Sequence, residues 1–138
     1  TARNLLGQNS SAVAEEAMAR FMEDGRFTEH IRKMRRLYRT RRDVLFEALS
    51  QECAEWLEPQ RTDAGMHMVA WLKHGLDDQA AHEALLAAGI DSLPISVYCI
   101  EPLDRAALVL GFSSVDERVI PRLVKRLADV LKGLKPAR

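Results

Sequence analysis

The stretch His30–Arg42, HIRKMRRLYRTRR, decides how the first third of this chain folds. Seven of its thirteen residues are Lys or Arg, and none is acidic. The stretch lies within a longer apolar pattern whose members recur at spacings of three, four or seven: Phe27, Ile31, Met34, Tyr38, Leu45 and Leu49. Such spacing places side chains on one stripe of an α-helix. The sequence therefore predicts one long amphipathic helix, with the basic residues filling its other faces.

The charge run has three interpretations: a solvated helix face, a nucleic-acid contact, or a surface that docks an acidic partner or another subunit. The whole chain has 20 basic and 20 acidic residues, so its formal net charge is zero. A dedicated nucleic-acid binder carries a basic excess, and the chain has no recognisable DNA-binding motif. Asp43 and Glu47 also add acids at helical spacing to the end of the run. A solvated face is the favoured interpretation.

The bulk properties indicate a globular protein of one domain. The chain has 138 residues, of which 47% are hydrophobic. No apolar run approaches the roughly 18 residues that a membrane span needs. The N-terminus has no signal-peptide pattern and no initiator Met, so we expect a processed product or an excised fragment. Cys53 and Cys99 have no partners at metal-ligand spacing, which predicts buried, reduced thiols and a cytoplasmic protein.

The capping and turn residues and the apolar runs along the rest of the chain predict an α+β fold with a small antiparallel sheet covered by helices. A first helix is expected after the caps Ser10 and Ser11, ending at Gly25, and Thr28 is expected to cap the long helix. Strand-like segments are expected at Met66–Trp71, Pro94–Ile100 and Ala106–Phe112. A helix is expected from Asp77 to Gly89. A final helix has Ser114 and Glu117 as a capping box and a bent or two-step first turn at Pro121.

The residues alone show no self-contained catalytic constellation. The four histidines lack metal-ligand spacing, and no phosphate loop, nucleophile elbow or paired-carboxylate motif is present. His67 is the most notable, because it follows the tight turn at Gly65, although a hydrogen-bonded structural role is favoured for it. The serines near residues 92–96 and 113–114 are interpreted as turn and cap residues.

Three segments carry a resemblance to a known family: FMEDGRFTEHIRKMRRLYRTRRDVLFEAL, DAGMHMVAWL and LVLGFSSV. Together they closely resemble the C-terminal portion of MocR-type regulators of the GntR family. Those proteins join a winged-helix DNA-binding domain to a domain shaped like a fold type I aminotransferase. The resemblance covers nearly the whole chain, and its most specific part is HIRKMRRLYRTRR.

The resemblance implies a domain organisation and a set of partners. Residues 1–50 would be the tail of the large domain and the long helix that links it to the small domain, and residues 51–138 would be the small domain. The winged helix that reads DNA, the lysine that holds pyridoxal 5'-phosphate, and most phosphate-binding residues would lie upstream. The intact protein would be a homodimer that senses an amino acid or an amine, and this chain alone would hold no catalytic or cofactor-binding residue.

Val109 departs from the aminotransferase pattern. Fold type I aminotransferases usually place an Arg at this point of the strand, where it pairs with the substrate carboxylate. A valine cannot form that pair, which favours a sensor over an active transaminase. Val109 and His67 are the two residues of this chain expected to meet a ligand, with Arg105 as another nearby group. The small domain of a genuine aminotransferase and a freestanding α+β interaction module are the alternatives.

Overall fold

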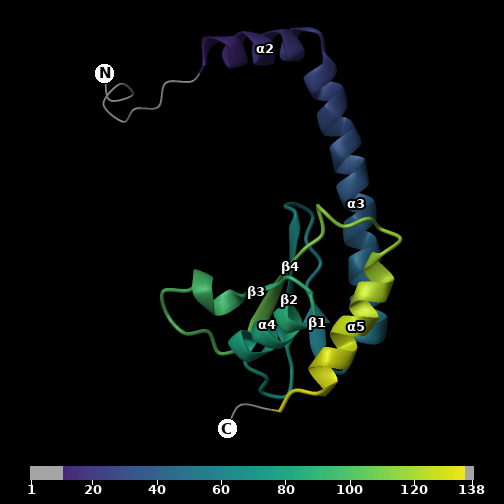
Figure 1. The fold of residues 1–138 in the computed structure, drawn as a ribbon, viewed down its shortest axis with the longest axis vertical. Helices are drawn as coiled ribbons and strands as arrows, with labels where there is room; N and C mark the ends of the chain where they lie inside the picture. Colours follow the sequence, from purple (N-terminus) through teal and green to yellow (C-terminus); the bar gives the residue numbers. More distant parts are fainter. Residues whose placement is uncertain (1–10, 136–138) are drawn as a thin grey trace. The chain divides into compact units, whose positions relative to one another are not determined.

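The computed structural model describes residues 11–135. The chain divides into two compact units, Thr1–Leu37 and Tyr38–Arg138. Helix α3, Arg26–Glu52, is the element that belongs to both. The second unit contains the sheet and the remaining helices (Figure 1).

The first unit contains α2, Ala12–Glu23, and the beginning of α3. Ser11 precedes α2 as predicted, but its side chain makes no capping hydrogen bond, and Ser10 lies outside the described residues. Gly25, with a φ of +75°, separates the helices. The prediction that Thr28 caps the long helix was wrong. The carbonyl of Gly25 already accepts the Glu29 amide at 3.1 Å, so α3 begins before Thr28.

The second unit is built on a four-stranded antiparallel sheet with the strand order β1-β2-β4-β3. The strands are β1, Leu57–Pro59; β2, His67–Leu72; β3, Leu93–Pro94; and β4, Ala107–Gly111. The predicted fold class is therefore confirmed, and so are the strands around Met68 and Leu110. The short strand β1 was not predicted.

One face of the sheet forms the core. Alternate residues of the two central strands are buried there: Met68, Ala70 and Leu72 of β2, with Leu108 and Leu110 of β4. They belong to one cluster with buried residues of α3, of α4 (Asp78–Ala87) and of α5 (Ile120–Lys132). From α3, Leu45 and Leu49 contribute, which are the last two members of the predicted stripe. Because side chains alternate along a strand, the intervening residues point to the opposite, more open face.

The predicted strand Pro94–Ile100 was wrong. Only Leu93 and Pro94 pair with β4, and Ile95–Tyr98 form the 3₁₀ helix η1. Proline has no amide hydrogen for a strand ladder. Two residues further on, the Ser96 amide donates to the carboxylate of Asp78 in α4 at 2.9 Å. A buried acid from another element therefore turns the chain away from the sheet.

The predicted capping box of the last helix was also wrong. Helix α5 begins at Ile120, too far from Ser114 for that residue to cap it. The carbonyl of Asp116 instead accepts the amides of Val119 and Ile120, which forms a separate turn before the helix. Pro121 then occupies the first helical turn, where a missing amide hydrogen costs little. The expected two-step start is thus present, with a different cap.

Candidate functional site

The open face of the sheet brings His67 and Val109 to the same side. His67 pairs with Gly111, and Val109 pairs with Val69 on one side and Leu93 on the other. Directly opposed residues of antiparallel strands point to the same face. The side chains of His67, Val69 and Val109 therefore share the open face, while Met68 and Leu108 point into the core.

Gly111 makes room for the His67 ring. A Cβ placed on Gly111 would lie 3.5 Å from Cδ2 of His67, so the ring lies over the glycine backbone. His67 is exposed and Val109 is half-buried. The ring therefore has one side against the sheet and the rest open to a ligand or to water.

Both residues line a groove of about 420 Å³. Its walls come from the end of β4 and the turn after it, from the segment between α4 and β3, and from α3 and α5. Three serines are among the residues that line it: Ser92, Ser113 and Ser114. The Ser92 side chain is 3% exposed, and its hydroxyl has no hydrogen-bond partner among the described residues. The sequence identified these serines only as turn and cap residues, because their approach depends on the tertiary fold.

Arg105 lies at the other end of the open face and already has partners. Its guanidinium is 2.7 Å from the carboxylate of Glu58 and lies over the Trp71 ring at 5.4 Å. The hydrogen bond and the positive charge of Arg105 lower the pKa of Glu58. The Trp71 indole in turn donates to the side-chain oxygen of Gln60 at 3.1 Å. Arg105 is about four residues along the strand direction from Val109, so it does not supply a cation beside that valine.

Three lysines among the described residues have polar partners outside the groove. Lys73 donates to the Ala54 carbonyl at 2.8 Å, Lys125 pairs with Glu52, and Lys132 pairs with Asp129. Within residues 11–135, no lysine lines the groove, and no cluster of His, Cys, Asp and Glu is suited to a metal ion. A lysine in a buried pocket is what covalent attachment of that cofactor requires.

The two thiols are free, as predicted, and differ in environment. Cys53 is fully buried, and burial is the main cause that raises its pKa from 9.0 to about 11. Cys99 is half-buried after η1 and donates to the Ile95 carbonyl at 3.4 Å, so the prediction of a buried thiol was wrong at this position.

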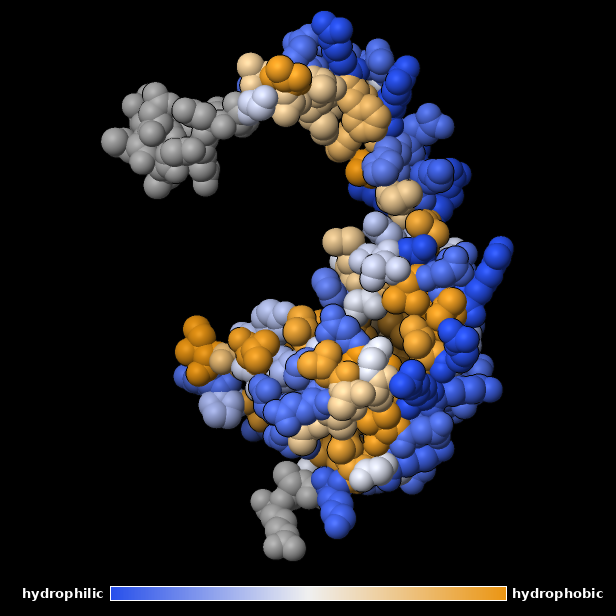
Figure 2. Space-filling view, viewed as in Figure 1, coloured by the Kyte–Doolittle hydropathy of each residue, from blue (hydrophilic) through white to orange (hydrophobic). Residues whose placement is uncertain are grey.

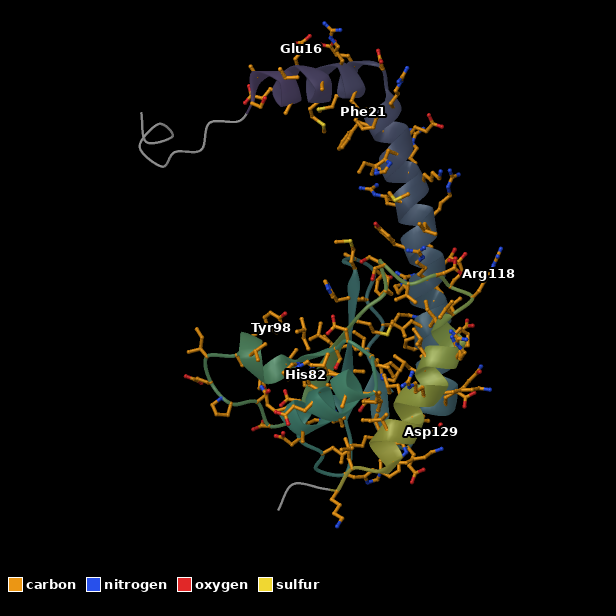
Figure 3. All side chains as sticks on the ribbon, viewed as in Figure 1. Glu16, Phe21, His82, Tyr98, Arg118 and Asp129 are labelled. Atoms are coloured by element: carbon orange, nitrogen blue, oxygen red, sulfur yellow. The ribbon has the colours of Figure 1, made fainter. Side chains whose placement is uncertain are left out.

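The loop after β3 carries a second exposed surface, which is apolar. Val97, Tyr98, Ile100 and Leu103 are all at least 48% exposed. Figure 2 shows hydrophobic atoms gathered over this lobe, and Figure 3 places Tyr98 on η1. None of the helices within residues 11–135 is long and apolar enough to cross a membrane.

No protein-family model matches the chain. The chain is 28% identical over 129 residues to the probable rhizopine catabolism regulatory protein MocR of Rhizobium meliloti, a match that covers 94% of this chain and 26% of MocR. It is 29% identical over 123 residues to the uncharacterised HTH-type transcriptional regulator YhdI of Bacillus subtilis, covering 89% of this chain and 26% of that protein. The chain thus spans about a quarter of the length of the curated relatives it matches.

Among solved structures, the chain is similar to kynurenine aminotransferase of Pyrococcus horikoshii. The TM-score is 0.72 at 28% sequence identity, and the match covers 82% of this chain and 28% of the aminotransferase. The resemblance stated from the sequence is therefore confirmed on both sides, regulator and aminotransferase. The chain is thus similar in sequence to MocR-type HTH regulators, and its fold is similar to a region of a fold type I aminotransferase.

Proposed function

We propose that this chain is the C-terminal part of the effector-sensing, aminotransferase-like domain of a pyridoxal-phosphate-dependent regulator of the GntR/MocR type. The similarity to MocR and YhdI over about nine-tenths of the chain supports this proposal. The intact protein would bind DNA through an N-terminal winged helix and would work as a homodimer. Pyridoxal phosphate would be held mainly outside this chain.

The observation that carries the proposal is Val109 on the open face, inside the groove. The resemblance implies an arginine here in an active aminotransferase. A valine that a ligand covers supplies apolar contact worth about 1 to 2 kcal/mol, whereas a hydrogen bond to a charged group is worth about 1.5 to 3 kcal/mol. The ligand end that meets this chain is then apolar, with His67 as the polar contact beside it. An amine, or an amino acid whose carboxylate lies elsewhere, is the proposed effector class.

The second candidate is the small domain of a genuine aminotransferase. The structural similarity to kynurenine aminotransferase favours it. In that case the substrate carboxylate would need a cation from outside this chain, since Arg105 is occupied by Glu58 and Trp71.

The full-length protein from the same gene separates the two candidates. We would measure its affinity for its own promoter DNA, with and without a panel of amines and amino acids, and its rate of amino transfer to a keto acid. If the protein is a regulator, we expect it to bind DNA with an affinity that changes with one class of ligand. We also expect amino transfer too slow to sustain turnover. Sustained turnover in a protein that binds no DNA would contradict the proposal and support the aminotransferase.

A further inference from the structure

Two consecutive arginines of α3, Arg41 and Arg42, contact the two loops that lead into and out of the His67–Gly111 end of the sheet. The loop 60–66 precedes His67, and the loop 112–119 follows Gly111. Both loops border the candidate site: Ser113, Ser114 and Val115 line the groove, and Gln60, Arg61 and Thr62 line a smaller hollow on the other side of His67.

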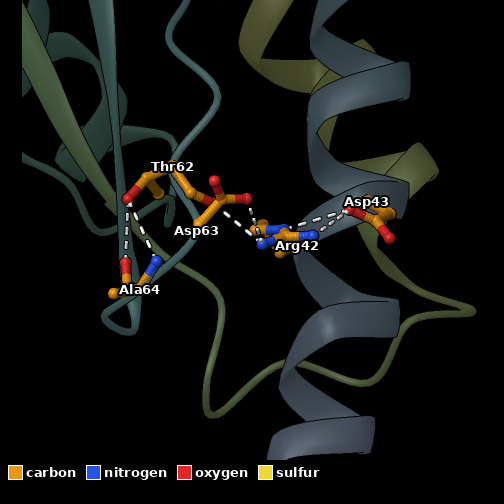
Figure 4. Close-up of polar contacts among 5 residues, drawn as sticks. All are labelled: Arg42, Asp43, Thr62, Asp63 and Ala64. Carbon is orange, nitrogen blue, oxygen red and sulfur yellow. Dashed lines mark hydrogen bonds and ion pairs between the residues drawn. The ribbon is translucent and has the colours of Figure 1, made fainter.

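Arg42 holds the loop before β2. Its guanidinium donates to the Thr62 carbonyl at 2.9 Å and to the Asp43 carboxylate at 2.9 and 3.0 Å, and it lies 3.7 Å from Asp63 (Figure 4). Thr62 in turn uses its hydroxyl to donate to the Ala64 carbonyl at 2.9 Å, which closes the loop on itself. The side chain of Arg42 is only 14% exposed. This degree of burial and this number of charge-assisted bonds exceed those of an ordinary solvated helix arginine.

Arg41 holds the loop after β4. It donates to the Ser113 carbonyl and pairs with Glu117 at 3.4 Å, and its side chain is 15% exposed. Leu45, one helical turn further along α3, lines the groove itself. The two loops are also joined directly, because the Phe112 amide donates to the Met66 carbonyl at 3.1 Å.

We infer that Arg41 and Arg42 are positioning residues of the candidate site, which fix its two bordering loops to a single turn of α3. The other basic residues of the stretch are exposed, whereas Arg41 and Arg42 are mostly buried and each contacts one of the two loops. If either loop moves, for instance because a ligand binds beside His67, the contacts of the same turn of α3 with that loop change. The inference rests on the proposed function only where it takes the groove as the ligand site.

Hydrogen–deuterium exchange of the 138-residue chain without any ligand tests this inference, so its result does not depend on the effector or on DNA binding. We expect Arg42→Ala to speed exchange of the Ala64 amide about tenfold or more, and Arg41→Ala to do the same for the amides of Arg118 and Val119, since a charge-assisted bond is lost in each case. Core amides of α4 and α5 should change far less. Arg39→Ala removes an exposed arginine from the same helix and is the matched control.

Two further measurements separate positioning from general stability. The ring signals of His67 in NMR spectra should shift in Arg42→Ala and stay in place in Arg39→Ala. Arg42→Lys should recover only part of the protection from exchange. Its ammonium group keeps the positive charge but cannot reach Thr62 and Asp43 together as a guanidinium does. Unchanged exchange in both loops, or an equal loss of protection across α4, α5 and the loops, would overturn the inference.

Discussion

Val109 and its neighbour Leu108 lie side by side in β4, yet their side chains meet opposite surroundings. Leu108 is fully buried in the core, and Val109 is half-buried on the open face between Val69 and Leu93. An arginine at position 109 can lay its aliphatic stem along the sheet and keep its charge in water. We therefore expect Val109→Arg to lower the free energy of unfolding by about 1 kcal/mol, and Leu108→Arg to lower it by more than about 4 kcal/mol. Urea denaturation measures both, and equal losses would contradict the placement of Val109 on the open face.

Cys53 predicts a dependence of stability on pH. Its pKa is raised to about 11 in the fold, from 9.0, because the buried thiolate is poorly solvated. Below pH 9 the thiol is neutral in both states, so it adds no pH dependence. Between pH 9 and 11 the unfolded chain releases the proton first, and the folded protein loses up to about 2 kcal/mol of stability. The free energy of unfolding of Cys53→Ala should therefore fall less steeply between pH 9 and 11 than that of the wild type. Cys99→Ala removes the half-buried thiol and should keep the wild-type slope of unfolding free energy against pH. Identical slopes in all three proteins would contradict the argument that burial raises the pKa of Cys53.

At the scale of elements, the helices and strands that the sequence predicted correctly are those whose apolar residues follow a local pattern. The short apolar run Met66–Trp71 after the turn at Gly65 was sufficient to predict β2, and the apolar stripe ending at Leu49 was sufficient to predict the long helix. The prediction failed where a distant residue supplies the hydrogen bond. Asp78 takes the Ser96 amide and turns a β-rich segment into η1. Strand β1 was missed because it is three residues long and is defined by its partner β2.

Asp77 caps α4, at the point where the sequence predicted that a helix begins, and the effect of removing this cap should be measurable. Its carboxylate accepts the Ala80 amide at 2.8 Å. Replacing such a cap with alanine typically costs about 1 kcal/mol, so we expect Asp77→Ala to reduce the free energy of unfolding by that amount. Ser11 occupies the same position before α2 but makes no capping bond, so Ser11→Ala should change stability by less than about 0.5 kcal/mol. A loss at Ser11 as large as that at Asp77 would show that composition, and not the bond, determines the effect.

At the scale of the whole molecule, the candidate site was only partly predictable. Once β2 and β4 are paired in the observed register, His67 and Val109 must share a face, and the sequence supplied both residues. The contacts of Arg41 with Ser113 and Glu117 join residues 72 and 76 positions apart in the sequence. The burial of Ser92 depends on the packing of several elements. No local pattern encodes such contacts, so the basic stretch gave no sign that two of its members are structural.

The isolated chain should not hold pyridoxal phosphate at one defined lysine. The lysines within residues 11–135 face solvent or bind carbonyl and carboxylate groups away from the groove, as Lys73 does with Ala54. Without a buried pocket none of them is poised for attachment. Mixing the chain with pyridoxal phosphate should give weak absorbance spread over several lysines after borohydride reduction. A stoichiometric adduct at a single lysine, located by mass spectrometry, would contradict this expectation.

The first unit predicts self-association of the isolated chain. None of the side chains of α2 is buried, Met22 is 54% exposed, and Phe21 packs edge-on against Phe27 at 6.2 Å. Together with Ile31 and Met34 of α3, these residues form an apolar surface of the kind that finds a partner in water. We expect the chain to form dimers or larger species through these helices, by packing or by exchange of helices.

Light scattering after size exclusion measures the mass of these species. The mass should fall toward that of the monomer in the double variant Met22→Glu, Ile31→Glu. Arg32→Gln, an exposed polar change on α3, should leave it unchanged. A wild-type chain that stays strictly monomeric at high concentration would rule out association through this surface.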